Sequence, residues 1–316
     1  MVVRQGTSGS LVRRRSPLLL TILVLLVAAV VATVLLVRGG GAPPRHDVTR
    51  SPSVQAWAAV VMDARTGAVL YAKAPDRHLP MASCTKIMTA LLVLARVPDL
   101  DASAIVPQDA VGQPGARLGL HVGDRITIRN LLLGLMVRSA TDCAITLAGY
   151  VANDEPKFAL LMNARAATLG LRDTHYSNAS GIKIANHYTS ARDLAELGRV
   201  AMRDARFRDL ARRVYATVTW PPDHSVRLHS HNILNETYAW VDGIKTGASE
   251  SARCCLAASG TFKGRRLIVA TLREPDRAQE MRDALKLFAF GAAQARATPP
   301  AGAPTGPSSA APATGT

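Results

Sequence analysis

The sequence predicts an α+β fold in which strands from both ends of one domain pair in an antiparallel sheet, with a block of helices packed against it. The prediction rests on the order of the elements. Apolar runs typical of strands come early, at 57–62 and 68–72, and again late, at 214–220, 243–246, 254–258 and 267–272. Segments with the apolar spacing of helices lie at 83–94, 131–137, 144–151, 157–169 and 189–202, and a last one follows at 276–290.

Local signals justify the elements one by one. Turn residues at 63–67 join the two early strands, so a β-hairpin is expected. The helix at 83–94 is apolar on most of its faces, which predicts a central, buried position. The polar segment 138–142 interrupts the next helical region. Thr189 or Ser190 is expected to cap the helix that follows.

Composition limits the possible classes of protein. The chain has 316 residues, of which 48% are hydrophobic, so it can bury a sizeable core. Its four cysteines are too few for a disulfide scaffold. The net charge of +15 suggests a polyanionic partner, but aromatic residues make up only 4% of the chain and no basic stripe interleaved with aromatics is visible. We therefore expect no nucleic-acid partner, and at most a bias toward an anionic cell envelope.

Residues 17–37 are uncharged and mostly aliphatic, and about 20 such residues span a bilayer as a helix. Arg13, Arg14 and Arg15 precede the segment and should keep that end in the cytoplasm. We therefore expect a single-pass membrane anchor with the rest of the chain outside the cytoplasm. The alternative is a secreted protein, if the N-terminal segment is cleaved.

The expected organisation has five parts. Low-complexity composition marks the linker and the C-terminal tail, neither of which can build a core. The parts are a cytoplasmic N-terminus at 1–16, a transmembrane signal anchor at 17–37, a linker at 38–53, a catalytic domain at 54–292 and a disordered Pro/Ala-rich tail at 293–316.

Three short motifs occur in a fixed order: Ser-Cys-Thr-Lys at 83–86, Ser-Ala-Thr at 139–141 and Lys-Thr-Gly at 245–247. Ser83 and Lys86 are three residues apart on one helix, so their side chains can meet. A serine hydroxyl becomes nucleophilic when a neighbouring base takes its proton. Lys86 can be that base if burial and a second cation, such as Lys245, lower its pKa. Each motif alone is weak, but their joint occurrence predicts serine-based acyl transfer.

The third motif adds the groups that would bind a substrate. The backbone amides of Ser83 and Ala248 are candidate oxyanion donors. Gly247 has no Cβ, so a substrate backbone could lie close to the strand edge. Lys245 and Thr246 could hold a substrate carboxylate.

Together these motifs resemble those of serine D-alanyl-D-alanine carboxypeptidases of the low-molecular-mass penicillin-binding protein family. The resemblance covers about 57–291 and includes further similar segments at 58–71, 80–90, 162–181, 187–197 and 241–249. It implies the penicillin-binding/β-lactamase-like transpeptidase fold, with a five-stranded antiparallel sheet packed with a helical lobe.

The resemblance also implies an acyl-enzyme mechanism on peptidoglycan stem peptides that end in D-Ala-D-Ala. Ser83 would attack the carbonyl, Lys86 would act as the base and Ser139 would pass a proton to the departing D-Ala. The substrate-binding residues would be Thr141, Lys245, Thr246, Gly247 and Ala248. The implied chemistry needs no metal or other cofactor, and β-lactams should acylate Ser83.

Several alternatives remain open from the sequence. Family members usually carry Asn where this chain has Thr141, which also leaves a catalytically weak penicillin-binding envelope protein as a hypothesis. A literal Ser-x-Asn occurs at 230–232, but the 139–141 motif fits the helix break better. The alternative activities are a DD-transpeptidase and a β-lactamase-like acyl transferase.

The cysteines allow two interpretations. Cys84 and Cys143 could form a disulfide near the pocket, as an exported domain permits. Alternatively, these two and the adjacent pair Cys254 and Cys255 are four buried thiols. A zinc site is not expected, because no ligand spacing fits.

Overall fold

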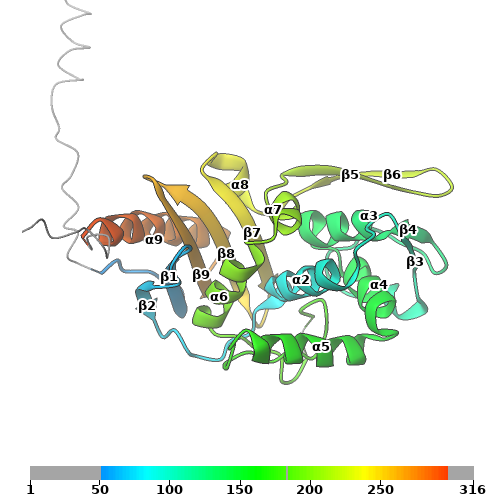
Figure 1. Cartoon of the computed structure of the whole chain (residues 1–316), viewed down its shortest axis with the longest axis horizontal. Coiled ribbons are helices and arrows are strands. Elements are labelled where there is room, and N and C mark those ends of the chain that lie inside the picture. Colours follow the sequence, from blue (N-terminus) through cyan, green and yellow to red (C-terminus); the bar gives the residue numbers. More distant parts are fainter. Residues whose placement is uncertain (1–50, 183, 298–316) are drawn as a thin grey trace, which may run out of the picture. The chain divides into compact units, whose positions relative to one another are not determined.

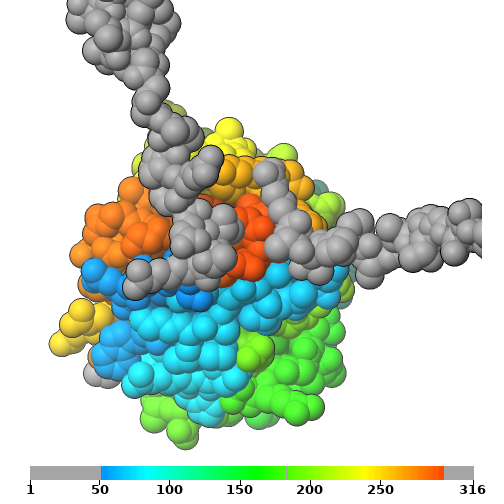
Figure 2. Space-filling model, turned by 90° about the vertical axis from the view of Figure 1, so that its left-hand side faces the viewer, coloured from blue at the N-terminus to red at the C-terminus, as the bar shows by residue number. Residues whose placement is uncertain are grey.

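The computed structural model of the chain describes residues 51–182 and 184–297. Its largest sheet has five antiparallel strands in the order β2-β1-β9-β8-β7, so the first hairpin lies beside the last strand, as predicted. Figure 2 shows this adjacency, with the blue first strands beside the orange and red C-terminal segments. These strands are β1 (Ala58–Asp63), β2 (Val69–Lys73), β7 (Val241–Ser249), β8 (Arg253–Phe262) and β9 (Arg265–Glu274).

A helical region lies to one side of the sheet, as Figure 1 shows. Its helices are α2 (Lys86–Arg96), α3 (Ile128–Leu133), α4 (Thr141–Ala152), α5 (Glu155–Thr168), α6 (Ala191–Ala201) and α7 (Ala205–Ala211). Helix α2 contacts α4, α5, α6 and β7, which confirms its predicted central position. Short helical segments are η1 (Ala82–Thr85), η2 (Gln108–Ala110), the π-helix η3 (Gly134–Arg138) and α8 (Ile233–Thr237).

Strand β1 is buried along its whole length, because the sheet is covered on both faces. Successive side chains of a strand point to opposite faces. Val60 and Met62 accordingly join the core around α2 and α6, whereas Val61 joins a second core that includes Phe288 of α9 (Arg277–Ala297). The sheet is thus held between the helical region and α9.

Two polar signals act as expected from the sequence. In the first hairpin, the Asp63 carboxylate accepts hydrogen bonds from the backbone N–H groups of Arg65 and Thr66 at 3.0 and 2.9 Å. At the start of α6, the Ser190 hydroxyl accepts from the Asp193 backbone N–H at 3.1 Å. Ser190, one of the two predicted caps, is therefore the N-cap of α6.

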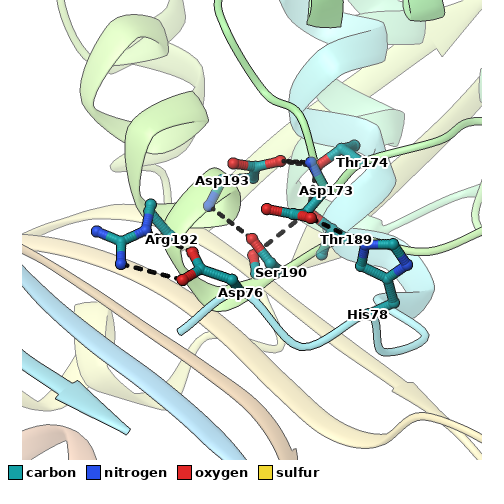
Figure 3. A network of polar contacts seen from close by, with 8 residues as sticks. All are labelled: Asp76, His78, Asp173, Thr174, Thr189, Ser190, Arg192 and Asp193. Carbon is teal, nitrogen blue, oxygen red and sulfur yellow. Dashed lines mark hydrogen bonds and ion pairs between the residues drawn. The ribbon is translucent and has the colours of Figure 1, made fainter. Parts of the chain in front are cut away.

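The α6 cap belongs to a larger polar network, drawn in Figure 3. Asp193 accepts from the backbone N–H of Asp173 and from the hydroxyl of Thr174, both at 2.8 Å. Arg192 pairs with Asp76, and His78 pairs with Asp173. The network therefore connects three segments that are far apart in the sequence: the approach to the first motif, residues 173–174 and α6.

Some elements differ from the sequence prediction. The additional strands are β3 (Ser103–Ile105), β4 (Arg125–Thr127) and β6 (His224–His229), which pairs with the predicted strand β5 (Tyr215–Trp220). The last helix, predicted for 276–290, continues to Ala297. The predicted anchor at 17–37 lies outside the described residues. Within the ranges that the structure describes, none of the helices has both the length and the apolar character needed to cross a bilayer.

Candidate active site

The first motif forms a tight turn that leads into α2. Ser83 lies in η1, and the α-helix itself begins at Lys86 rather than at the serine. Lys86 Nζ donates hydrogen bonds to Ser83 Oγ at 3.1 Å and to the Ser180 carbonyl oxygen at 2.6 Å. The structure thus places a lysine amine directly against the predicted nucleophile.

Burial prepares this lysine to act as a base. Only 1% of the Lys86 surface is exposed, and desolvation, with the nearby charge of Lys245 as the second cause, lowers its pKa to about 7. Burial likewise lowers the pKa of Lys245 to about 8, and its Nζ donates to the Thr246 carbonyl at 3.0 Å. A large fraction of Lys86 is therefore uncharged near neutral pH, as proton abstraction from Ser83 requires.

The second motif lies where a π-helix ends. The π-helix η3 is followed by Ser139 in the left-handed region, with φ of 64°. Such backbone is unfavourable for residues other than glycine and often occurs at functional sites. Helix α4 then begins at Thr141, whose backbone N–H donates to the Ala116 carbonyl at 2.8 Å. Ser139 and Thr141 are both buried, yet both line the same cleft as Ser83.

The sequence interpretation did not identify Asp142 as a residue of the site. Its carboxylate accepts backbone N–H groups of Leu118, Gly119 and Leu120, at distances between 2.9 and 3.3 Å. This fixes the loop whose Gly115 and Ala116 form one wall of the cleft. The available signal was an acidic residue in the first turn of a helix, which by itself does not point to a loop more than twenty positions earlier.

The third motif lies on β7, one of the two edge strands of the five-stranded sheet. A Cβ added to Gly247 would lie 2.6 Å from the Met81 carbonyl and 3.0 Å from the Ser83 amide nitrogen. The absence of a side chain at Gly247 therefore allows the nucleophile turn to pack against the strand. The sequence analysis had explained this glycine differently, by the close approach of a substrate backbone. Thr246 and Ala248 line the cleft, whereas Lys245 and Gly247 lie behind its surface.

These elements enclose a cleft of about 470 Å³. The sequence interpretation missed Arg277, which lies on the cleft wall and donates from Nη2 to the Gly247 carbonyl at 3.1 Å. Burial opposes its charge, but the paired Glu280 outweighs this effect and the pKa of Arg277 is raised. The lining residues are Ala82, Ser83, Lys86, Pro114, Gly115, Ala116, Ser139, Thr141, Ser180, Gly181, Ile182, His231, Thr246, Ala248, Ser249, Glu250, Ser251 and Arg277.

The structure separates the two candidate second motifs. Of the segment 230–232, only His231 lines the cleft. Asn232 is buried and donates to the Asn235 side-chain oxygen at 3.1 Å. The motif at 139–141 is thus the one whose two hydroxyl-bearing residues line the cleft together with Ser83.

All four cysteines are free thiols, so the disulfide alternative for Cys84 and Cys143 is not formed. Burial raises the pKa of the Cys84 thiol to about 12, which leaves it protonated and unreactive. Cys84 Sγ instead faces the Lys245 carbonyl at 3.7 Å. Among the residues that the structure describes, no group of three or more His, Cys, Asp or Glu side chains could hold a metal ion.

A serine hydrogen-bonded to a buried lysine, a second hydroxyl from a helix break and a Lys-Thr-Gly edge strand define a serine acyl-transfer enzyme on a penicillin-binding fold. The comparisons with known proteins agree. The sequence model of a family described as D-alanyl-D-alanine carboxypeptidase matches residues 45–276. The chain therefore belongs to this family of serine DD-carboxypeptidases, and the predicted family, fold and enzyme class are confirmed.

Individual relatives show how far the similarity extends. A D-alanyl-D-alanine carboxypeptidase of Streptomyces sp. strain K15 is 32% identical over 76% of this chain and 88% of its own length. The carboxypeptidase DacF of Bacillus subtilis is 31% identical over 65% of this chain, which spans only 54% of that longer relative. The crystal structure of the Streptomyces K15 DD-transpeptidase matches 77% of this chain and 99% of its own, with a TM-score of 0.73 and 30% identity.

Proposed function

We propose that the cleft removes the terminal D-Ala from peptidoglycan stem peptides through an acyl-enzyme on Ser83. Family membership supports a D-Ala-D-Ala substrate and covalent inhibition by β-lactams. The observation that carries the proposal is the 3.1 Å contact between Ser83 Oγ and a buried Lys86 whose pKa is about 7. This pair can generate a serine nucleophile in the cleft, because the buried amine lies against the partly exposed serine hydroxyl.

The first step forms an ester and breaks an amide. Lys86 takes the Ser83 proton while Oγ attacks the carbonyl carbon between the two D-alanines. The backbone N–H groups of Ser83 and Ala248 stabilise the negatively charged oxygen. The proton passes through Ser139 to the nitrogen of the departing D-Ala, and the carbon–nitrogen bond breaks.

The second step returns the enzyme to its starting state. Water adds to the ester, loses a proton to Lys86, and releases the shortened peptide as Ser83 recovers its proton. At the start of the cycle the substrate carboxylate lies near Thr246 and Arg277, a hydroxyl and a cation that line the β7 side of the cleft. Thr141 is assigned to the substrate amide, although its hydroxyl reaches less far than the usual asparagine amide.

Two measurements test this assignment. The purified domain is incubated with a peptide ending in D-Ala-D-Ala, and free D-Ala is quantified. It is also labelled with fluorescent penicillin. We expect both signals in the wild type and neither in Ser83→Ala. Absence of D-Ala release and of labelling in the folded wild type would overturn the proposal.

A second candidate is transfer to an amine acceptor, which the name of the Streptomyces K15 DD-transpeptidase favours. Both activities share the acyl-enzyme and differ only in the nucleophile that attacks the ester. Adding glycine-containing acceptor peptides and measuring the ratio of transfer product to free acid distinguishes them. A penicilloyl enzyme that persists for many minutes in mass spectra would argue against a β-lactamase-like activity.

We further propose that residues 17–37 anchor the chain in the cell membrane with the catalytic domain on the extracytoplasmic side. The length of this uncharged segment and the preceding arginines support this topology. Protease treatment of intact cells expressing the full chain should degrade the catalytic domain. A full-length chain that stays protected, or that appears in the medium, contradicts a single-pass anchor with this orientation.

A further inference from the structure

A buried histidine that takes part in none of the steps above contacts the nucleophile turn. His187 is 9% exposed, and its Nε2 lies 2.7 Å from the hydroxyl of Thr85, the last residue of the η1 turn and the one directly before Lys86. On its other side, Nδ1 accepts a hydrogen bond from the Ser177 backbone N–H at 3.1 Å. The ring therefore bridges the turn and the segment that begins at 177.

The backbone contact determines the state of the ring. A nitrogen that accepts an N–H carries no proton, so the proton of neutral His187 resides on Nε2. His187 therefore donates to Thr85 Oγ1, and the hydroxyl in turn donates to the Ala82 carbonyl at 2.8 Å. Burial, followed by the nearby charges of His175 and Lys86, lowers the pKa of His187 to about 4, so this arrangement persists at neutral pH.

The segment contacted by His187 also holds the catalytic lysine. Its Ser180 carbonyl accepts from Lys86 Nζ at 2.6 Å. Asn178 Oδ1 accepts from the backbone N–H groups of Ser180 and Gly181 at 3.2 and 2.7 Å, which fixes the carbonyl in place. A Cβ on Gly181 would lie 1.9 Å from the Ala82 carbonyl oxygen, so the segment and the nucleophile turn are in direct contact.

The ends of this segment are also anchored. His175 and Tyr188 exchange backbone hydrogen bonds at 2.9 and 3.1 Å, closing residues 175–188 into a loop. The neighbouring Thr174 is tied to Asp193 in the network of Figure 3. The loop thus has a fixed base, and the His187–Thr85 contact lies between that base and the active site.

We propose that His187 is a positioning residue for acylation. Through Thr85 it holds the nucleophile turn against the 177–181 loop, so that Lys86 Nζ keeps its hydrogen bonds to both Ser83 Oγ and the Ser180 carbonyl. The inference rests on the proposed function of the cleft. Without the contact, the turn and the loop can separate, and Lys86 loses either its acceptor or its contact with the serine. The ionisable groups that face His187 are His175, the Tyr176 ring and Lys86.

The test compares variants that remove the His187–Thr85 hydrogen bond with variants that keep it; because Thr85→Val also removes the bond to the Ala82 carbonyl, His187→Leu tests the histidine contact alone. Thr85→Val keeps the shape of the side chain and removes the hydroxyl, whereas Thr85→Ser keeps the hydroxyl. His187→Leu removes the donor, whereas His187→Gln retains an N–H near the position of Nε2. The rate constant of acylation by fluorescent penicillin is measured from pH 5 to 10, normalised to the active fraction by end-point labelling.

We expect Thr85→Val and His187→Leu to acylate at least about tenfold more slowly, with the pH midpoint moved upward because water reaches Lys86. Thr85→Ser and His187→Gln should recover most of the rate. The acylation rate of the double variant Thr85→Val/His187→Leu should be no lower than that of either single variant, since the two single variants and the double variant all break the same His187–Thr85 contact. Noncovalent binding of the product peptide to Ser83→Ala backgrounds should be unchanged by Thr85→Val.

Three results would overturn the inference. One is a Thr85→Val enzyme with the wild-type rate and pH profile. The second is a loss confined to melting temperature, with the normalised rate unchanged, since this would make the contact purely structural. The third is Thr85→Ser behaving like Thr85→Val. If wild type is labelled and Ser83→Ala is not, such results reject the positioning role alone, whereas an unlabelled wild type rejects the proposed function as well.

Discussion

Arg277 Nη1 donates to both carboxylate oxygens of Glu280, at 2.8 Å each, on the first turn of α9. Its second nitrogen, Nη2, holds the Gly247 carbonyl of β7. Glu280 is 4% exposed, and burial raises its pKa to about 7 even though Arg277 opposes the shift. The ion pair with Glu280 thus fixes the Arg277 guanidinium on the cleft wall, although this group lies at the end of a long, flexible side chain.

This geometry predicts that Arg277 recognises the substrate carboxylate. Arg277→Leu should reduce kcat/KM for a D-Ala-D-Ala peptide about tenfold or more, because a charge-assisted hydrogen bond contributes about 1.5–3 kcal/mol. A peptide with a C-terminal amide should be affected little, so steady-state kinetics on both peptides provide the measurement. The double variant Arg277→Leu/Glu280→Gln controls for the unpaired buried acid, and should recover stability without recovering the activity. Equal losses on both peptides would contradict this role.

The low pKa of Lys86 predicts a pH profile. Acylation needs the uncharged amine, so the rate should rise as the pH increases through about 7. The charge of Lys245 is the second cause of the low pKa of Lys86, after burial of the amine. Lys245→Gln should therefore move the midpoint of the acylation pH profile to higher pH. Stopped-flow labelling with saturating penicillin separates this shift from weaker binding. A midpoint that stays in place in Lys245→Gln would show that burial alone sets the pKa.

The left-handed backbone of Ser139 predicts a separation of stability from activity. Ser139→Gly and Ser139→Ala both remove the hydroxyl and should slow the release of D-Ala. Glycine tolerates a φ of 64° and alanine does not, so the glycine variant should be more stable by about 1 kcal/mol. Denaturant unfolding of the two variants provides the comparison. Equal stabilities would indicate that the backbone relaxes when the hydroxyl is removed.

The close packing at Gly247 predicts that a single methyl group there impairs the site. Gly247→Ala would place a carbon 2.6 Å from the Met81 carbonyl, so we expect a loss of about 1–3 kcal/mol in unfolding free energy and slower acylation. Gly264→Ala is a control for an added methyl group without a clash, because nothing lies within 4 Å of the added carbon, and its φ of 79° affects stability alone. The control should lose some stability and no activity. If both variants acylate at the wild-type rate, the nucleophile turn tolerates displacement.

The candidate site residues that the sequence analysis grouped together are linked by local spacing. Ser83 and Lys86 are one helical turn apart, and the motif at 139–141 lies at a break that the polar residues themselves reveal. The early and late strands carry strong β-forming runs, so an antiparallel sheet that joins both ends of the domain was expected. The late run at 214–220 differs, because it pairs with β6 in a separate two-stranded sheet. Strands of three residues, such as β3 and β4, are too short to give a periodic signal.

The residues that the sequence did not reveal reach the site through tertiary contacts. Arg277 comes to Gly247 only because β8 and β9 fold back as a hairpin and α9 begins beside the edge strand. Asp142 acts on backbone N–H groups more than twenty positions earlier. Ser180 contributes a carbonyl, which every residue has, so its role depends entirely on the conformation of its loop.

The position of β7 at an edge of the sheet affects which peptide chains can reach its backbone. An edge strand exposes backbone donors and acceptors, and such edges invite pairing with other chains. Here the nucleophile turn packs against that strand at Gly247, and the cleft beside it is walled by the loop at Gly115 and Ala116. A slender, flexible peptide end can enter this space, whereas the strand of a folded neighbour cannot. The walls that shape the catalytic cleft thus also shield this part of the sheet edge from pairing with a strand of another molecule.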